Sequence, residues 1–228
     1  MACMMRTFVA VLVIAASFSL VGCVSPSSPT TTSVATPAPV PVPVATTVGP
    51  PPNVDPRIWM ATCVPPPDGF NQVVRPTALH LDISSVGERS MFEKAIAQVK
   101  EDLKDLAPQI PIDLNPGGSG ATFPVTVEPG VTNPRTGKPV AAWTHADWGA
   151  DFIVDRGTIK LGSVEVLYDL VTLVKEIYRA LGVLGSSPVD GLLASTAWNN
   201  AFLSPPERLA VLKHLHPDVK PGSICSAQ

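Results

Sequence analysis

Charged side chains are scarce in this chain. They make up 15% of its 228 residues and leave a formal net charge of −3, whereas about a quarter of a typical globular chain is charged. No stripe of lysine and arginine is available to neutralise phosphates, so a nucleic-acid-binding protein is excluded. Aromatic residues are also few, at 6%. With so little charge, the sequence is equally unlike a coiled coil or a solvated acidic tail.

A long apolar segment of transmembrane length is also missing, although the chain begins with a shorter one. Arg6 precedes an apolar run over residues 7–21, which is shorter than the roughly 20 residues that span a bilayer. The run ends in Leu20-Val21-Gly22-Cys23. These four residues resemble the lipobox of bacterial lipoproteins. The alternative is an ordinary secretory signal in which Cys23 stands by chance.

The lipobox resemblance implies a cellular location and a processing site. Residues 1–22 would be the lipoprotein signal peptide, removed before Cys23, and the Cys23 sulfur would carry the diacyl group. Two acyl chains suffice for stable anchoring. We therefore expect a protein held at the cell membrane by its lipid, on the extracytoplasmic face.

Residues 23–55 have the composition of a tether. No charged side chain occurs in residues 24–54, and ten prolines lie in residues 24–56 among serine, threonine, valine and alanine. Such a segment favours extended polyproline II and cannot bury enough apolar surface to fold. Its threonines are compatible with an O-glycosylated stalk as well as with an unmodified linker. Residues 56–228 then form one extracytoplasmic domain.

Two cysteines remain for that domain, Cys63 and Cys225, one near each of its ends. Outside the cytosol a pair of this kind most simply forms a disulfide. Two free thiols are the alternative.

The patterning of this domain predicts an α+β fold, with a short sheet, two long helices and a C-terminal helix. Alternation predicts a strand at 77–83, and Ser85 with Glu88 forms a capping box before a helix that runs to about residue 106. A second strand is expected at 124–128. The predicted later elements are a β-hairpin over 151–161 that turns at Arg156-Gly157, a helix from Ser163 to Leu181 ended by Gly182, and a helix capped by Ser204 with Glu207 at its third position.

The long helix contains KEIYRALGVLGSS at residues 175–187. This segment resembles the zinc-binding segment of zincin metallopeptidases, in particular the matrixin-like metzincins, whose motif is H-E-x-x-H-x-x-G-x-x-H. In that motif two histidines on one helix face and a third beyond the glycine bind zinc, and the glutamate is the general base. The resemblance places Glu176 at the base position and Gly182 at the turn. It extends to the order of elements: an early helix, a hairpin before the motif helix, and a terminal helix opening Leu203-Ser-Pro.

The departures from the motif concern the metal. Lys175, Arg179 and Gly185 occupy the three histidine positions, and cations repel a divalent ion. The resemblance therefore implies a degenerate zincin-like domain with no metal and no cofactor. Glu176, the weak catalytic candidate, would instead pair with Arg179 three residues on. An ordinary amphipathic helix ending in glycine and an active metalloenzyme are the alternatives.

A second candidate site is the run Trp143-Thr-His145-Ala-Asp147-Trp148. Its His-x-Asp pair lies between two tryptophans and could contact a ligand, carbohydrate included. The alternative is that these are loop tryptophans folding back onto the core.

These observations favour a non-enzymatic binding or envelope-associated module over an enzyme. Its partner would be an envelope protein, a peptide or a glycan. The competing hypothesis is an extracytoplasmic hydrolase, either metallopeptidase-like or with a site of another kind.

Overall fold

The computed structural model describes residues 46–65, 71–115, 117–194 and 200–228. The predicted signal peptide, Cys23 and most of the predicted tether lie outside these residues. No helix in the described part is long and apolar enough to cross a membrane. The first described element, strand β1 (Thr47–Val48), falls within the segment assigned to the tether and pairs in parallel with strand β7 (Ile224–Cys225) near the end of the chain.

The fold is α+β, as predicted, and its main feature is a five-stranded mixed sheet in the order β3-β2-β4-β6-β5. Strands β3, β2, β4 and β6 run parallel, and β5 runs antiparallel to β6 at the edge. The bounds of the strands are β2 Leu79–Asp82, β3 Ile112–Asp113, β4 Ala121–Val127, β5 Ala142–Trp148 and β6 Val154–Leu161.

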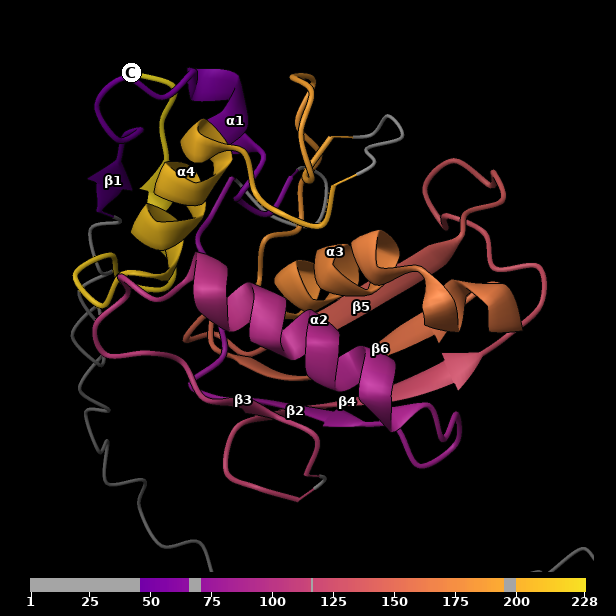
Figure 1. The fold of residues 1–228 in the computed structure, drawn as a ribbon. Helices are drawn as coiled ribbons and strands as arrows, with labels where there is room; N and C mark the ends of the chain where they lie inside the picture. Colours follow the sequence, from indigo (N-terminus) through magenta and orange to yellow (C-terminus); the bar gives the residue numbers. More distant parts are fainter. Residues whose placement is uncertain (1–45, 66–70, 116, 195–199) are drawn as a thin grey trace, which may run out of the picture. The chain divides into compact units, whose positions relative to one another are not determined.

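Two helices, α2 (Arg89–Asp102) and α3 (Leu170–Ala180), lie side by side on one face of this sheet (Figure 1). Shorter elements complete the domain: helix α1 (Pro56–Met60), the 3-10 helix η1 (Val164–Tyr168) and helix α4 (Pro205–Leu215).

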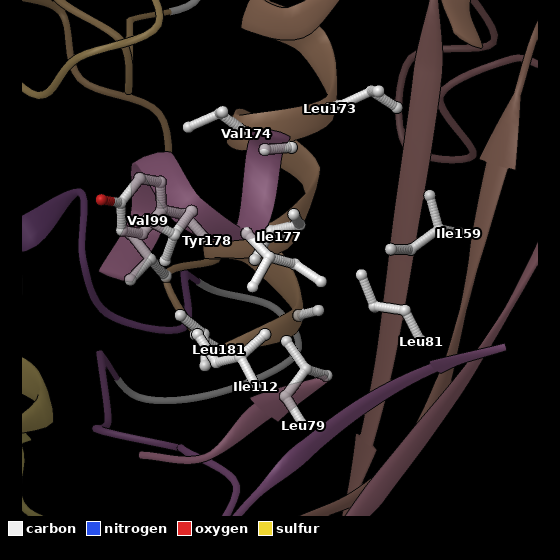
Figure 2. Close-up of a cluster of buried hydrophobic side chains, with 14 of the residues drawn as sticks. Leu79, Leu81, Val99, Ile112, Ile159, Leu173, Val174, Ile177, Tyr178 and Leu181 are labelled. Atoms are coloured by element: carbon white, nitrogen blue, oxygen red, sulfur yellow. The ribbon is translucent and has the colours of Figure 1, made fainter. Parts of the chain in front are cut away.

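The main core lies between the sheet and these two helices. Figure 2 shows Leu79 and Leu81 of β2 and Ile159 of β6 opposite the apolar side of α3, on which Val174, Ile177 and Leu181 recur at helical spacing. All six side chains are buried. Burial of this one helix face fixes the orientation of α3, and with it the direction in which Lys175, Glu176 and Arg179 point.

A smaller apolar cluster joins the two ends of the domain. Trp59 and Ile58 of α1 pack there with residues near the C-terminus, and Cys63 is bonded to Cys225, with the two Cα atoms 6.6 Å apart. The disulfide prediction is confirmed. Because the bridge ties the segment just after α1 to β7, it closes nearly the whole domain into one covalent loop.

The predicted hairpin at 151–161 is wrong. Val154–Leu161 form the single strand β6, and its antiparallel partner is β5, which the sequence had suggested to be a loop. Gly157 does not turn the chain. A Cβ at this position would lie 2.2 Å from the Phe123 ring and 2.3 Å from the His145 carbonyl oxygen. Glycine is required here because the neighbouring strands approach closely. From the sequence alone, a glycine needed for close packing cannot be told from a glycine needed for a turn.

Two helix starts also differ from prediction. Ser85 donates to the Val125 carbonyl, and α2 begins at Arg89 without a side-chain cap. Helix α3 begins at Leu170, with Asp169 accepting from two backbone amides, after the separate 3-10 helix η1. The predicted start at Ser204 is confirmed: the Glu207 carboxylate accepts from the Ser204 backbone N–H at 2.9 Å.

Candidate functional site

A hollow of about 570 Å³ lies beside the edge strand β5, where α3 ends. Strand β5 supplies one wall, and the segment just after α3 supplies another. The lining includes the whole of the predicted run 143–148, together with Arg135, Arg179, Leu184 and Gly185. The structure thus brings together the two candidate sites that the sequence presented separately.

A buried ion pair lies against this hollow. Arg179 Nη1 donates to Glu176 Oε1 at 2.6 Å, and the two side chains are only 21% and 4% exposed. The other carboxylate oxygen of Glu176 accepts from the Thr144 hydroxyl at 2.6 Å. The predicted Glu176–Arg179 pair is therefore present, and it is buried and connected to β5. Each carboxylate oxygen of Glu176 accepts one of these hydrogen bonds, and the side chain, 4% exposed, is not among those lining the hollow.

Lys175, one residue earlier on α3, donates to the backbone carbonyl of Ala194. Burial, and secondarily the neighbouring Arg179 charge, lower the pKa of this ammonium group. The Lys175 side chain therefore links α3 to the segment around Ala194 by a hydrogen bond.

The same segment is also held by Glu207 of α4. This buried carboxylate accepts from the backbone N–H groups of Leu192 at 3.1 Å and Leu193 at 2.7 Å, and from the Ser204 hydroxyl at 2.8 Å. A fully hydrogen-bonded carboxylate of this kind fixes backbone geometry. Residues 192–194, which come after the lining residues Leu184 and Gly185, are therefore held from two sides, by Lys175 and by Glu207.

Two glycines after α3 permit close packing. Gly182 has a φ of +95°, and a Cβ there would lie 2.0 Å from the Val74 carbonyl oxygen. At Gly185, a Cβ would lie 2.6 Å from the Ala61 carbonyl oxygen and 2.9 Å from its Cα. No side chain fits at Gly185, so this position has no room for a metal-binding histidine.

The residues present therefore do not fit zinc. Lys175 and Arg179 are engaged cations, and the third position accepts only glycine. Within the described ranges, no three or more histidine, cysteine, aspartate or glutamate side chains are grouped so as to hold a metal ion.

The predicted ligand-contact residues lie on β5. The His145 and Asp147 side chains are 62% and 45% exposed, and His145 Nε2 lies 3.0 Å from Asp147 Oδ1. Trp143 and Trp148 are both half-buried and both line the hollow, and Trp148 also packs against the main core. The alternative that the tryptophans pack onto the core thus holds for Trp148. That alternative placed Trp143 and Trp148 on a loop, which is wrong, because both lie on strand β5.

The outer edge of β5 is open: no described strand pairs with it. Gly162 N–H donates to the Ala141 carbonyl at 2.7 Å, which makes these residues a hydrogen-bonded pair. Hydrogen-bonded and non-hydrogen-bonded pairs alternate along an antiparallel ladder. The backbone N–H and C=O groups of Thr144 and Ala146 therefore point away from β6, toward the open edge.

Sequence reasoning missed Thr144 and Arg135. Thr144 could have been found from the alternation of 142–148, in which small residues occupy every second position. Arg135 comes from a loop connecting β4 to β5, and nothing in the local pattern points to its place in the hollow.

Comparison with known proteins adds no relative to this picture. No protein-family model matches the chain, and a search of curated proteins gives no match.

Proposed function

We propose that this chain is a lipid-anchored protein of the cell envelope whose domain is a degenerate, non-catalytic zincin-like module that binds a peptide in extended conformation. The peptide lies along the open edge of β5, over the hollow bounded by Trp143 and Arg179. The alternative function, an extracytoplasmic hydrolase, would need a reactive group facing that hollow.

The non-catalytic part of the proposal is supported by the contacts of α3. Glu176 gives one oxygen to Arg179 and the other to Thr144. A general base must have a free lone pair within reach of the proton that it removes. The Glu176 side chain is only 4% exposed and does not line the hollow, so its carboxylate is out of reach of a ligand there. It also has no metal-bound water to activate if the motif positions that would hold the metal are those that carry Lys175, Arg179 and Gly185.

The zincin-like part is supported by the order of elements. Helix α2 comes early, the antiparallel pair β5–β6 precedes α3, and α4 opens at Leu203-Ser204-Pro205. This is the order that the resemblance implies, although the antiparallel pair before α3 is β5–β6 and not the hairpin expected within residues 151–161.

The observation that carries the peptide proposal is the open edge of β5 beside a hollow. An unpaired strand edge is a template for a further strand, whose backbone hydrogen bonds provide affinity and whose alternate side chains enter neighbouring pockets. Strand β5 is seven residues long, enough for several such bonds. Of the formally charged residues that usually protect an exposed edge, β5 has only Asp147.

Replacing Ala146 with proline tests the proposal. Proline removes the outward N–H of this residue and leaves the ladder with β6 intact, because Ala146 is at a non-hydrogen-bonded position. We expect binding of unstructured peptides, selected from a random library on the wild-type protein, to weaken about tenfold or more, since a lost bond and a displaced neighbour cost about 1.4 kcal/mol.

The matched control is Ala146→Ser, which keeps the N–H and should retain wild-type affinity. Both variants are checked by thermal unfolding. Equal peptide affinity of the proline variant and the wild type would contradict strand addition. Selection of glycans but no peptides by the wild-type protein would favour a carbohydrate ligand, and turnover of a bound peptide would favour the hydrolase.

Lipid anchoring has its own test. Cys23→Ala removes the sulfur that the lipobox resemblance assigns to the diacyl group. We expect the variant to lose incorporation of a palmitate analogue and to keep its leader, as measured by labelling and intact mass. A Cys23→Ala protein that still incorporates the label would refute the anchor.

A further inference from the structure

His80 lies on β2 between Leu79 and Leu81, whose side chains face the helices, so alternation along the strand places it on the opposite face of the sheet. Its side chain is only 8% exposed. Its ring Nδ1 is 2.8 Å from Asp113 Oδ1 on β3, and its Nε2 is 3.0 Å from the backbone carbonyl oxygen of Ser119. Gly118 packs on the ring so closely that a Cβ there would lie 2.5 Å from a ring carbon. The ring therefore connects two strands to the segment 117–120, which leads into β4.

Both groups that face the ring are hydrogen-bond acceptors. A carbonyl oxygen never donates, and an ionised carboxylate only accepts. A neutral imidazole has one N–H, so it can satisfy only one of the two contacts. The imidazolium has two N–H groups and satisfies both. The geometry at His80 is thus the geometry of the protonated ring.

We propose that a proton on His80 fastens segment 117–120 to strands β2 and β3, and that loss of this proton releases the segment. The fastening is a pH-sensitive device separate from the peptide edge at β5. When the ring becomes neutral, the bond to Asp113 or the bond to Ser119 must break. The backbone bond is the one that yields, because the carboxylate holds the remaining N–H through a charge-assisted bond.

The surrounding charges favour the protonated form. Asp113 is the charged group that faces the ring, and Lys100 of α2 acts on Asp113 rather than on His80. Asp82 follows on the same face of β2 and accepts from the Ser84 backbone N–H. The hydrogen bond to Asp113, followed by the one to Ser119, raises the pKa of His80 above its ordinary value.

The sign of the resulting pH dependence follows from that direction. A raised folded-state pKa stabilises the folded chain fully below the unfolded pKa, and this contribution is lost as pH rises through the folded pKa. His214 acts in the opposite sense. It is buried, Nε2 donates to the Val74 carbonyl at 2.9 Å, and burial lowers its pKa to about 4. Global stability therefore mixes two opposed terms, and a local measurement is required.

The test is a pH titration of the mature chain in detergent micelles, labelled with nitrogen-15, following the His80 ring nitrogens and the amides of Gly118 and Gly120. We expect two ring N–H signals at pH 6, below the ordinary pKa of histidine, and one signal above the His80 midpoint. We also expect the hydrogen bond between the His80 ring and the Ser119 carbonyl to be lost at the same midpoint, seen as shifts of the Gly118 and Gly120 amide signals.

Asp113→Asn is the informative variant, because an amide can donate to a neutral ring. We expect the pH midpoint of His80 titration to be lower in this variant than in the wild type. We also expect segment 117–120 to keep its hydrogen bond to the ring at pH values at which the wild type has lost it. His145→Gln, at an exposed histidine, is the matched control and should leave the midpoint unchanged. A neutral His80 at pH 6, or a wild-type midpoint in Asp113→Asn, would overturn the proposal.

Discussion

Replacing Cys63 and Cys225 with serine is expected to lower the free energy of unfolding by up to about 5 kcal/mol. The bridge closes a loop with a sequence separation of 162 residues, and the chain-entropy model gives about 5 kcal/mol for a loop of that length. Both cysteines are buried in the cluster around Trp59, so the serine hydroxyls also enter an apolar environment.

Urea unfolding of the double variant and the wild type, with and without reductant, measures this difference. Reductant should lower the wild-type midpoint and leave the variant unchanged. We expect the pairing of β1 with β7 to open first in the double variant, because the bridge lies at that end of the domain. Equal unfolding midpoints for the oxidised wild type and the double variant would show that the bridge does not stabilise the fold.

Replacing Arg179 with methionine should lower the free energy of unfolding more than replacing both members of the buried ion pair together. The change leaves the Glu176 carboxylate, 4% exposed, with only the Thr144 hydroxyl as a partner. Breaking a buried pair from one side typically costs 3–5 kcal/mol. We expect about 3 kcal/mol here, because the Arg179 side chain is 21% exposed and water reaches its end of the pair.

The double variant Glu176→Gln with Arg179→Met completes a cycle. The glutamine amide can still bond to Thr144 without a buried charge, so the double variant should recover about half of the stability lost in Arg179→Met. Thermal and urea unfolding of the four proteins measure the coupling. Additive effects of the two substitutions would mean that the pair makes no specific contribution.

The sequence predicted those features of the fold that depend on local spacing. The Glu176–Arg179 pair follows from a separation of three on one helix, and the start of α4 follows from Ser204, two prolines and Glu207. The Cys63–Cys225 bridge follows from counting cysteines in a chain that the sequence predicts to be extracytoplasmic. The first two inferences need only a few neighbouring residues, and the third needs only the predicted cellular location of the chain.

The features that could not be predicted depend on distant packing. Strand β5 was missed because its inward positions are alanine and threonine rather than large apolar residues, and Thr144 is inward because it meets Glu176 of α3. Gly157 indicates a turn in sequence, and only the approach of Phe123 from β4 reveals its role. Likewise, nothing near Gly185 in sequence reveals that Ala61 lies against it.

The central claim is that β5 receives a peptide as an added strand. Amide hydrogen exchange of the wild-type protein, with and without a selected peptide, tests it most directly. The account predicts that the peptide slows exchange at Thr144 and Ala146, whose N–H groups point to the open edge. It predicts little change at Trp143 and His145, which already bond to β6. Unchanged exchange at Thr144 and Ala146 under saturating peptide would contradict it.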